Sequence, residues 1–310
     1  MPQFYLIPKR LARKAPILVT IVQWFEAAAF RFVFWIMRLL PIEYATAIAA
    51  GFFRLSGRFS DKVKKARTNL AVAFPDTSEE WREQTAREIF SNLGTAAAEL
   101  IKLEDIWEQR EQRLEFVFEP LAEEHIARKG ATVFVTAHVG AWQLTNLVSL
   151  QHRLTISTVY APESNPALRD MMLKLRESFG VKLIPSDAGV RPLLKELAAG
   201  HSIGLAMDTR LDTGKLIPFF GREALTNTSA ARLALRSGAA LIPIRAERLP
   251  GCRYRITAYD PLVTQNPQAS PDDQALELST RINDCFEQWI RDTPGQWICL
   301  KRRWPKAHKL

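Results

Sequence analysis

From residue 131 onward, short apolar runs alternate with segments whose composition suits helices. The apolar runs are rich in β-branched residues and too short for helices, which is typical of strands buried in a sheet. They cover residues 133–136, 156–160, 181–184, 202–207, 240–244 and 254–258. Helices are expected near 141–151, 166–179, 189–199, 226–237 and 271–292. The alternation predicts an α/β fold with a mostly parallel central sheet flanked by helices. Residues 43–130 are predicted to be helical.

The N-terminal 40 residues combine basic residues with long apolar runs. Four basic residues lie within positions 9–14, before an uncharged run over 15–25, and Glu26, Arg31 and Arg38 interrupt the apolar sequence that follows. A clean transmembrane span is not expected, because it needs about 20 predominantly apolar residues. The aromatic residues favour a hydrophobic or amphipathic helix in the membrane interface. The alternatives are a buried helix of a soluble core and a cleaved signal peptide.

We therefore divide the chain into a membrane-associating segment, residues 1–40, and a single α/β domain, residues 41–310. The apolar content of 47% is ample for a core, and the net charge of +9 attracts anionic lipid, phosphorylated substrates or nucleic acid. No nucleic-acid recognition motif is present, so we expect no nucleic-acid partner. The scattered Cys252, Cys285 and Cys299 predict neither a disulfide framework nor a metal site.

One histidine is placed where a catalytic base is expected. The predicted strand 133–136 leads through Ala137 to His138, and Gly140 then precedes a helix-compatible segment. Ligands bind at the carboxyl ends of strands in open α/β sheets, and an imidazole there is a candidate general base. The alternative is a loop histidine that bonds a backbone carbonyl. Asp208 ends the predicted strand 202–207 and is expected to lie at the same edge as His138.

The remaining motifs predict no bound metal or cofactor. The segment from Asp208 to Gly214 lacks the spacing and the bidentate glutamate of a calcium loop. No phosphate-binding loop, dinucleotide fingerprint or serine-nucleophile elbow is present. Residues 218–221 are predicted to form an apolar loop before a helix that starts near Thr226. An apolar wall beside polar strand ends suits a long hydrocarbon substrate.

Several short blocks occur in a fixed order along nearly the whole chain. They are Asn69-Leu70 with Phe74-Pro75, Thr136-Ala137-His138-Val139-Gly140-Ala141-Trp142, Tyr160, Asn165-Pro166-Ala167-Leu168, Asp208, Pro218-Phe219-Phe220-Gly221, Thr226, Arg232-Leu233-Ala234 with Gly238-Ala239, and Pro294-Gly295-Gln296-Trp297 with Arg302-Arg303-Trp304. Together they resemble the lauroyl/myristoyl acyltransferases of lipid A biosynthesis, within the lysophospholipid acyltransferase superfamily.

The resemblance implies an O-acyltransferase in which His138 removes the proton of a substrate hydroxyl. That hydroxyl then attacks the thioester of a fatty acid carried by acyl carrier protein. The family signature is a histidine, four residues and then an acidic residue, and the acidic position falls on Gln143. A carboxylate would orient the imidazole and stabilise its protonated form, whereas a glutamine offers no charge. The same amide replacement in the serine protease triad lowers kcat by about 10⁴.

Three explanations of Gln143 stay open. The glutamine is an engineered, inactivating replacement of a native glutamate, or another carboxylate takes over, with Asp208 the nearest candidate. In the third, the chain is a natural family member with low or no activity.

Further roles follow from the resemblance. Arg176 corresponds to an arginine that binds a phosphate or the developing oxyanion. The alternative is that Arg176 is an ordinary helix residue exposed to solvent. The residues implied in substrate binding are Trp142, Phe219, Phe220, Gly221, Thr226 and Arg232. The segment from Trp297 to Trp304 is basic and aromatic, and its charges are Lys301, Arg302 and Arg303. It suits the binding of phosphorylated headgroups, and the alternative is that its charges are only solvated.

The implied donor is acyl carrier protein or another acyl thioester, with no cofactor. The implied acceptor is a hydroxyl of an anionic glycolipid, and the first candidate is a lipid A precursor. The implied location is the cell inner membrane, with the active site facing the cytoplasm. The alternatives are another acceptor, such as a mannosylated phosphoinositide or an aminolipid, and a lipid-binding pseudoenzyme.

Overall fold

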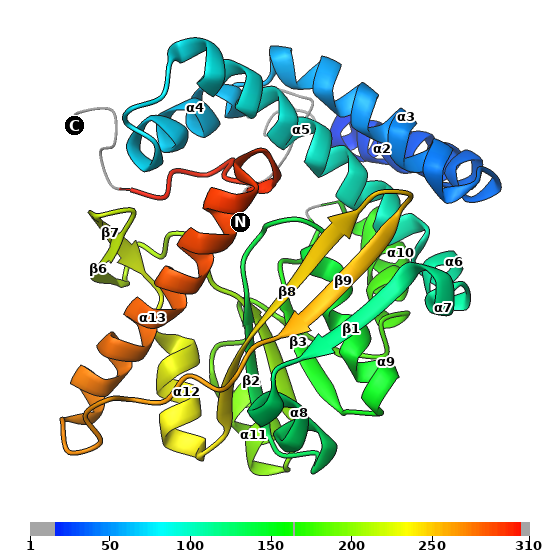
Figure 1. Ribbon diagram of the computed structural model, residues 1–310. Helices are drawn as coiled ribbons and strands as arrows, with labels where there is room; N and C mark the ends of the chain where they lie inside the picture. The colour runs from blue at the N-terminus through cyan, green and yellow to red at the C-terminus, as the bar shows by residue number, and fades with distance from the viewer. Residues whose placement is uncertain (1–15, 164, 305–310) are drawn as a thin grey trace.

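A computed structural model describes residues 16–163 and 165–304, in which helices surround a central sheet (Figure 1). The basic residues at positions 9–14 lie outside the described residues. The strands of the main sheet are β1 (Leu114–Phe118), β2 (Thr132–Thr136), β3 (Ile156–Tyr160), β4 (Lys182–Pro185), β5 (Ser202–Ala206), β8 (Ala240–Leu249) and β9 (Arg253–Ala258). A separate hairpin consists of β6 (Lys215–Phe219) and β7 (Arg222–Thr226).

The helices fall into an N-terminal layer and a set that packs on the sheet. The N-terminal set is α2 (Pro16–Leu39), α3 (Ile42–Ser56), α4 (Lys62–Ala73), α5 (Glu79–Ile101), α6 (Leu103–Glu108) and α7 (Arg110–Arg113). The others are α8 (Pro120–Ala127), α9 (Val148–His152), α10 (Pro166–Glu177), α11 (Arg191–Ala198), α12 (Ser229–Ser237) and α13 (Pro271–Asp292). Short 3₁₀ helices are η1 (Gly57–Phe59), η2 (Trp142–Leu147) and η3 (Pro294–Gln296). In Figure 1, α3, α4 and α5 lie across the top of the molecule.

The main sheet has the strand order β1-β9-β8-β2-β5-β3-β4, and its neighbours are parallel except for β8 and β9. All five residues of β2 are buried. Val133 and Val135 pack in the core with α11, α12 and α13, whereas Phe134 packs with α8, α9 and α10 on the other face. Because successive strand residues point to opposite faces, a continuous apolar run is buried on both. The predicted α/β fold with a mainly parallel sheet is confirmed.

Helix α2 turns its charged residues toward the protein and its large apolar residues outward. Arg31 donates to the backbone oxygen of Ala167 at 3.1 Å, and the Glu26 carboxylate accepts from Asn165 at 3.2 Å. Arg38 pairs with Glu104. The exposed side chains of α2 include Trp24, Phe25, Phe32 and Trp35. Residues 19–39 are long and apolar enough to cross a membrane.

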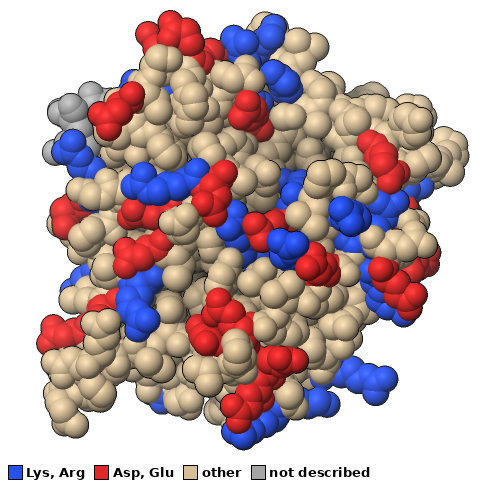
Figure 2. Space-filling view, viewed as in Figure 1, with Lys and Arg blue, Asp and Glu red and all other residues tan. Residues whose placement is uncertain are grey.

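Helix α3 continues this apolar surface. Its exposed residues recur at helical spacing and are Tyr44, Ile48, Phe52 and Leu55. Its opposite side packs on α5, where a Cβ at Gly94 would meet the Ala49 carbonyl oxygen at 2.3 Å. In Figure 2 charged side chains of both signs are interspersed over the visible face, with few of them at the upper right, where α3 lies.

Three expectations for local structure were wrong. Residues 114–118, expected to be helical, form the edge strand β1, in which inward Leu114 and Phe118 alternate with exposed positions. The expected apolar loop at 218–221 lies within the β6–β7 hairpin, whose turn residues Phe220 and Gly221 have φ of 52° and 67°. This two-residue turn matches the twist of paired strands. Helix α12 consequently starts at Ser229, not near Thr226.

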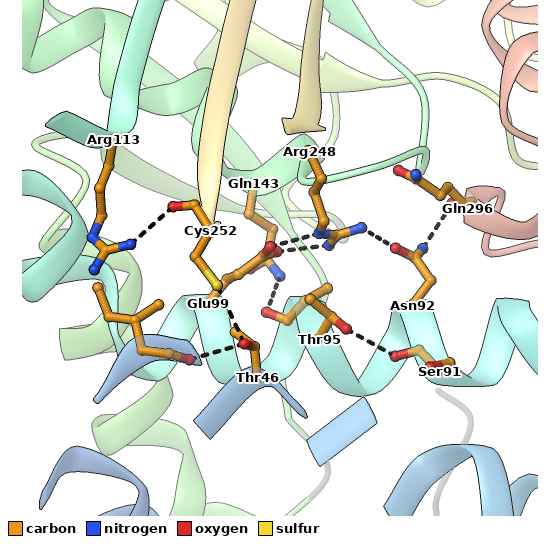
Figure 3. Close-up of polar contacts among 12 residues, drawn as sticks. Thr46, Ser91, Asn92, Thr95, Glu99, Arg113, Gln143, Arg248, Cys252 and Gln296 are labelled. Atoms are coloured by element: carbon orange, nitrogen blue, oxygen red, sulfur yellow. Dashed lines mark hydrogen bonds and ion pairs between the residues drawn. The ribbon is translucent and has the colours of Figure 1, made fainter. Parts of the chain in front are cut away.

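A buried ion pair connects the helical layer to the sheet (Figure 3). Arg248, near the end of β8, donates Nε and Nη2 to the Glu99 carboxylate of α5 at 2.5 and 2.6 Å. Arg248 also donates to Asn92, whose Nδ2 donates to the Gln296 carbonyl oxygen at 2.7 Å. The Glu99 side chain is only 3% exposed. The network therefore joins α5, β8 and the C-terminal segment.

We expect Glu99→Gln to lower the free energy of unfolding by about 3–5 kcal/mol, because it leaves the mostly buried Arg248 charge without an opposite charge. The matched control is Glu115→Gln in the exposed Arg255–Glu115 pair, 43% and 49% exposed, which should cost less than about 1 kcal/mol. Denaturant unfolding in detergent measures both. Equal losses in the two variants would contradict a special role for the buried pair.

Candidate active site

His138 and Asp208 meet because they follow neighbouring parallel strands. In the register of β2 and β5, Thr136 lies beside Ala206, so the residues two positions further on face each other. The His138 Nδ1 lies 2.7 Å from Asp208 Oδ1, and the His138 backbone N–H donates to the same oxygen at 3.1 Å. A carboxylate only accepts, so Nδ1 carries the proton and Nε2 is left as the available base.

The C-terminal segment completes the surroundings of this pair. Trp297 Nε1 donates to Asp208 Oδ2 at 3.0 Å, and the Ile298 N–H donates to the His138 carbonyl oxygen at 2.8 Å. Asn69 of α4 is fully buried and donates to the carbonyl oxygens of Cys299 and Lys301 at 2.8 and 2.7 Å. These bonds hold Trp297 against Asp208.

Burial and pairing act in opposite directions on the two titratable groups. Burial disfavours the charged imidazole, but the Asp208 charge and hydrogen bond outweigh it, so the pKa of His138 is raised above its ordinary 6.5. Burial likewise opposes ionisation of Asp208, which is 3% exposed. The interactions with His138 and Trp297 outweigh it and lower the pKa of that carboxyl group. The arrangement is a carboxylate-oriented imidazole whose protonated form is stabilised.

Two cavities meet at His138, whose side chain is 30% exposed. One, of about 570 Å³, has polar and cationic groups in its wall, among them Arg210, Asn227, Ser229, Lys301 and Arg303. The other, of about 380 Å³, is largely apolar, and its wall includes Leu93, Leu100, Phe134, Ile156, Phe179 and Ile244. Both walls are largely apolar, but the first contains more charged groups, so we call it the polar cavity and the second the apolar cavity.

Gln143 lines the apolar cavity but makes no hydrogen bond to His138 within the described residues. Its Nε2 donates to the Ala96 carbonyl oxygen of α5 at 3.5 Å (Figure 3). The imidazole Nδ1 is bonded to Asp208. The carboxylate that contacts the imidazole thus comes from the neighbouring strand, as in the second of the three explanations of Gln143.

Two other candidate residues line the same cavity as the imidazole. The Trp142 ring lies 5.4 Å from the His138 ring, centroid to centroid. Arg176 of α10 pairs with Glu163 at 2.6 Å and lies over the Tyr160 ring, 5.6 Å from its centroid. The Arg176 Nη1 is buried without a partner among the described residues. This arginine is not a solvated helix residue, because it faces the cavity of His138.

The structure places the other predicted substrate-binding residues away from both cavities. Phe219 stacks on Trp304, and Phe220 stacks on Trp297. Gly221 forms the hairpin turn with Phe220. The apolar loop expected to border substrate is thus a buried aromatic cluster beneath Trp297.

Thr226 and Arg232 have structural partners of their own. The Thr226 hydroxyl accepts from Arg303 at 2.8 Å. Arg232 pairs with Asp272 at 2.7 Å on the surface and also donates to Thr228. Arg232 thus pairs with the first turn of α13, and the arginines that line the polar cavity are Arg210 and Arg303.

Trp297 is a residue of the site whose contact with Asp208 was not predicted from the sequence. The sequence analysis placed it in the Pro294-Gly295-Gln296-Trp297 block and at the start of the basic, aromatic segment. Its contact with Asp208 joins residues 89 positions apart, so no local pattern signals it.

Comparison with known proteins agrees with this geometry. The chain matches the bacterial lipid A biosynthesis acyltransferase family over residues 11–306, and it belongs to that family. It is therefore an acyltransferase. It is 26% identical over 283 residues to the lipid A biosynthesis lauroyltransferase of Escherichia coli K12, covering 87% of this chain and 88% of that protein.

Two further likenesses were found. Phosphatidylinositol mannoside acyltransferase of Mycobacterium tuberculosis H37Rv is 27% identical over 177 residues, covering 56% of this chain and 54% of that protein. The crystal structure of the 1-acyl-sn-glycerophosphate acyltransferase from Thermotoga maritima is 14% identical, with a TM-score of 0.38, and covers 80% of this chain and 98% of that one.

We expect Asp208→Asn to lower kcat by about 10²–10⁴, as the loss of an imidazole-orienting carboxylate does elsewhere. A base must be unprotonated, so activity falls as the pH drops through the raised pKa of His138. The acid limb of the pH profile should therefore lie above 6.5 in the parent protein and move to lower pH in the variant. An unchanged limb would contradict the pairing.

We expect Gln143→Glu to give no increase in kcat, because Asp208 already occupies Nδ1 and a carboxylate at 143 cannot donate to the Ala96 carbonyl. Acyl transfer by the parent and the variant, measured side by side, checks this. A gain of tenfold or more would instead indicate a missing catalytic carboxylate at position 143.

Proposed function

We propose that this protein transfers a fatty acyl chain from an acyl thioester to a hydroxyl of a membrane glycolipid, with His138 as the general base. The observation that carries the proposal is the His138–Asp208 pair at the junction of an apolar and a polar cavity. Acyl carrier protein is the proposed donor, and a lipid A precursor is the first proposed acceptor. The likeness to the lauroyltransferase supports both roles.

The proposed reaction starts with the acceptor hydroxyl hydrogen-bonded to His138 Nε2. The imidazole removes the proton as the oxygen attacks the thioester carbonyl, and Asp208 stabilises the imidazolium that forms. Collapse of the tetrahedral intermediate breaks the carbon–sulfur bond, and the departing thiolate takes the proton from the imidazolium. The products are the acyl ester and the free thiol, and the base is regenerated.

The two cavities suit the two substrates. The apolar cavity, with Phe134, Ile156 and Phe179 in its wall, accommodates a hydrocarbon chain that gains stability when it leaves water. Arg176, in the same wall with a buried and unbonded Nη1, is proposed to stabilise the oxyanion or a phosphate. Trp142 is proposed to contact substrate beside the imidazole. The net charge of +9 favours encounter with an acidic carrier protein.

We propose that residues 1–40 associate with the cell inner membrane, with residues 41–310 as a single α/β domain whose site faces the cytoplasm. The support is the outward apolar face of α2, whose charged residues are turned toward the protein. The exposed Tyr44, Ile48, Phe52 and Leu55 of α3 extend that face. Aromatic residues on such a surface suit the membrane–water interface.

A mannosylated phosphoinositide is a second candidate acceptor. Its support is the likeness to phosphatidylinositol mannoside acyltransferase, which extends over 56% of this chain.

The test is mass-spectrometric detection of acyl transfer from acyl–acyl carrier protein to each acceptor, in detergent micelles. We expect an ester product with the parent protein and a loss of at least about 10³-fold with His138→Ala, since the general base is removed. His201→Ala, which removes a histidine that pairs with Glu196 far from the cavities, is the matched control and should keep full activity. Lipid binding without product from any acceptor would instead support a pseudoenzyme.

A further inference from the structure

The polar cavity contains a cluster of positive charge that the proposed proton transfer does not use. Lys301 and Arg303 line it from the C-terminal segment, and Ser229 lines it from the first turn of α12. No carboxylate of the described residues forms an ion pair with Lys301 or Arg303. Asp208, which lines the same cavity, already accepts hydrogen bonds from His138 and Trp297.

Arg303 is a buried cation with neutral partners. The residue is 2% exposed, and it donates to the Leu225 carbonyl oxygen at 3.0 Å and to the Thr226 hydroxyl at 2.8 Å. Its Nε is buried without a hydrogen-bond partner. Burial lowers the pKa of the guanidinium to about 10. The Asp208 charge acts in the opposite direction and raises this pKa, and a bound anion would stabilise the buried guanidinium further.

Lys301 adds an exposed cation at the same cavity. The residue is exposed, and its ammonium group makes no hydrogen bond or ion pair among the described residues. Its charge lowers the pKa of Lys62 after the effects of burial and Lys65, and it also opposes protonation of His138. Lys301 and His138 line the same cavity, so a ligand in that cavity can contact both residues.

The start of α12 contributes partial positive charge to the same place. Thr228, at the N-cap position, makes no side-chain capping bond, and the Asn227 Oδ1 instead accepts from the Ser229 N–H at 2.9 Å, which leaves the N–H groups of the next residues. The first-turn N–H groups of a helix favour anions. Asn227 and Ser229 at this end both line the cavity.

From the buried Arg303 with its unpartnered Nε, the Lys301 ammonium without a partner among the described residues, and the first turn of α12, we infer a phosphate-binding subsite in the polar cavity next to His138. It holds a phosphate ester of one of the two substrates. This inference rests on the proposed function for the identity of those substrates. The phosphate belongs either to the acceptor glycolipid or to the phosphopantetheine arm of the donor. Lys301 contacts the phosphate directly, and Arg303 supplies a fixed charge behind it.

The test compares affinities for two pairs of probes that differ only in a phosphate, without turnover. The acceptor pair is an acylated diglucosamine lipid with and without its phosphate monoester. The donor pair is acyl-4′-phosphopantetheine and acyl-pantetheine. Calorimetry on the full chain in detergent micelles gives the four affinities for the parent, Lys301→Met and Arg302→Met. Arg302 is the matched control, since it is exposed and adjacent but does not line the cavity.

We expect the parent to prefer the phosphorylated member of one pair by at least about tenfold, which a single charged hydrogen bond can supply. Lys301→Met should abolish most of that preference, and Arg302→Met should retain it. The pair that shows the effect identifies the substrate that carries the phosphate. Absence of any phosphate preference in the parent, or an equal loss in both variants, overturns the subsite. Acyl transfer is measured separately: product without phosphate preference refutes the subsite alone, and phosphate preference without product refutes the proposed function alone.

Discussion

The hydrogen bond between His138 and Asp208 depends on a carboxylate that is almost completely buried. A buried charge is stable only when its hydrogen-bonding capacity is satisfied. Three N–H groups do this, two from His138 and one from Trp297. His138 contributes most to keeping Asp208 ionised at the carboxyl end of β5, and the C-terminal segment adds the hydrogen bond from Trp297. The site is in this sense a product of the whole chain.

That dependence explains why polar residues far from the imidazole are buried in the helical layer. Asn69 of α4 bonds the carbonyl oxygens on either side of residue 300, and Asn92 of α5 bonds the Gln296 carbonyl. The Glu99–Arg248 pair fixes Asn92 in turn (Figure 3). Gly140, with φ of 61°, lies so close to β8 that a Cβ would meet the Ala246 carbonyl oxygen at 2.5 Å. The layer, the sheet and the loop after β2 are thus held in one arrangement around the imidazole.

The sequence predicted those parts of the structure whose cause is local. The buried strands and the positions of His138 and Asp208 follow from apolar runs and from what comes directly after them. The edge strand β1 was missed because its outward positions are polar or exposed, and charged helices flank it. The hairpin at residues 215–226 was missed because Phe220 at positive φ is not a residue that turn rules favour. Its conformation is held by Trp297 and Trp304, which come from a distant segment.

Gln143 shows that the catalytic pairing, too, depends on contacts that a local sequence pattern does not reveal. A signature places the carboxylate by its spacing from the histidine, whereas the imidazole requires only an acceptor at Nδ1. The parallel register of β2 and β5 supplies that acceptor from another strand, so residue 143 is left to form the wall of the apolar cavity. Helices α5 and α10 form much of the same wall, and they also support the apolar helices α3 and α2. Under the proposed function, the apolar cavity holds the acyl chain directly beneath the membrane-facing helices. The polar cavity lies on the other side of the imidazole. A glycolipid that reacts at His138 can thus keep its hydrocarbon near the membrane while its headgroup lies in the polar cavity.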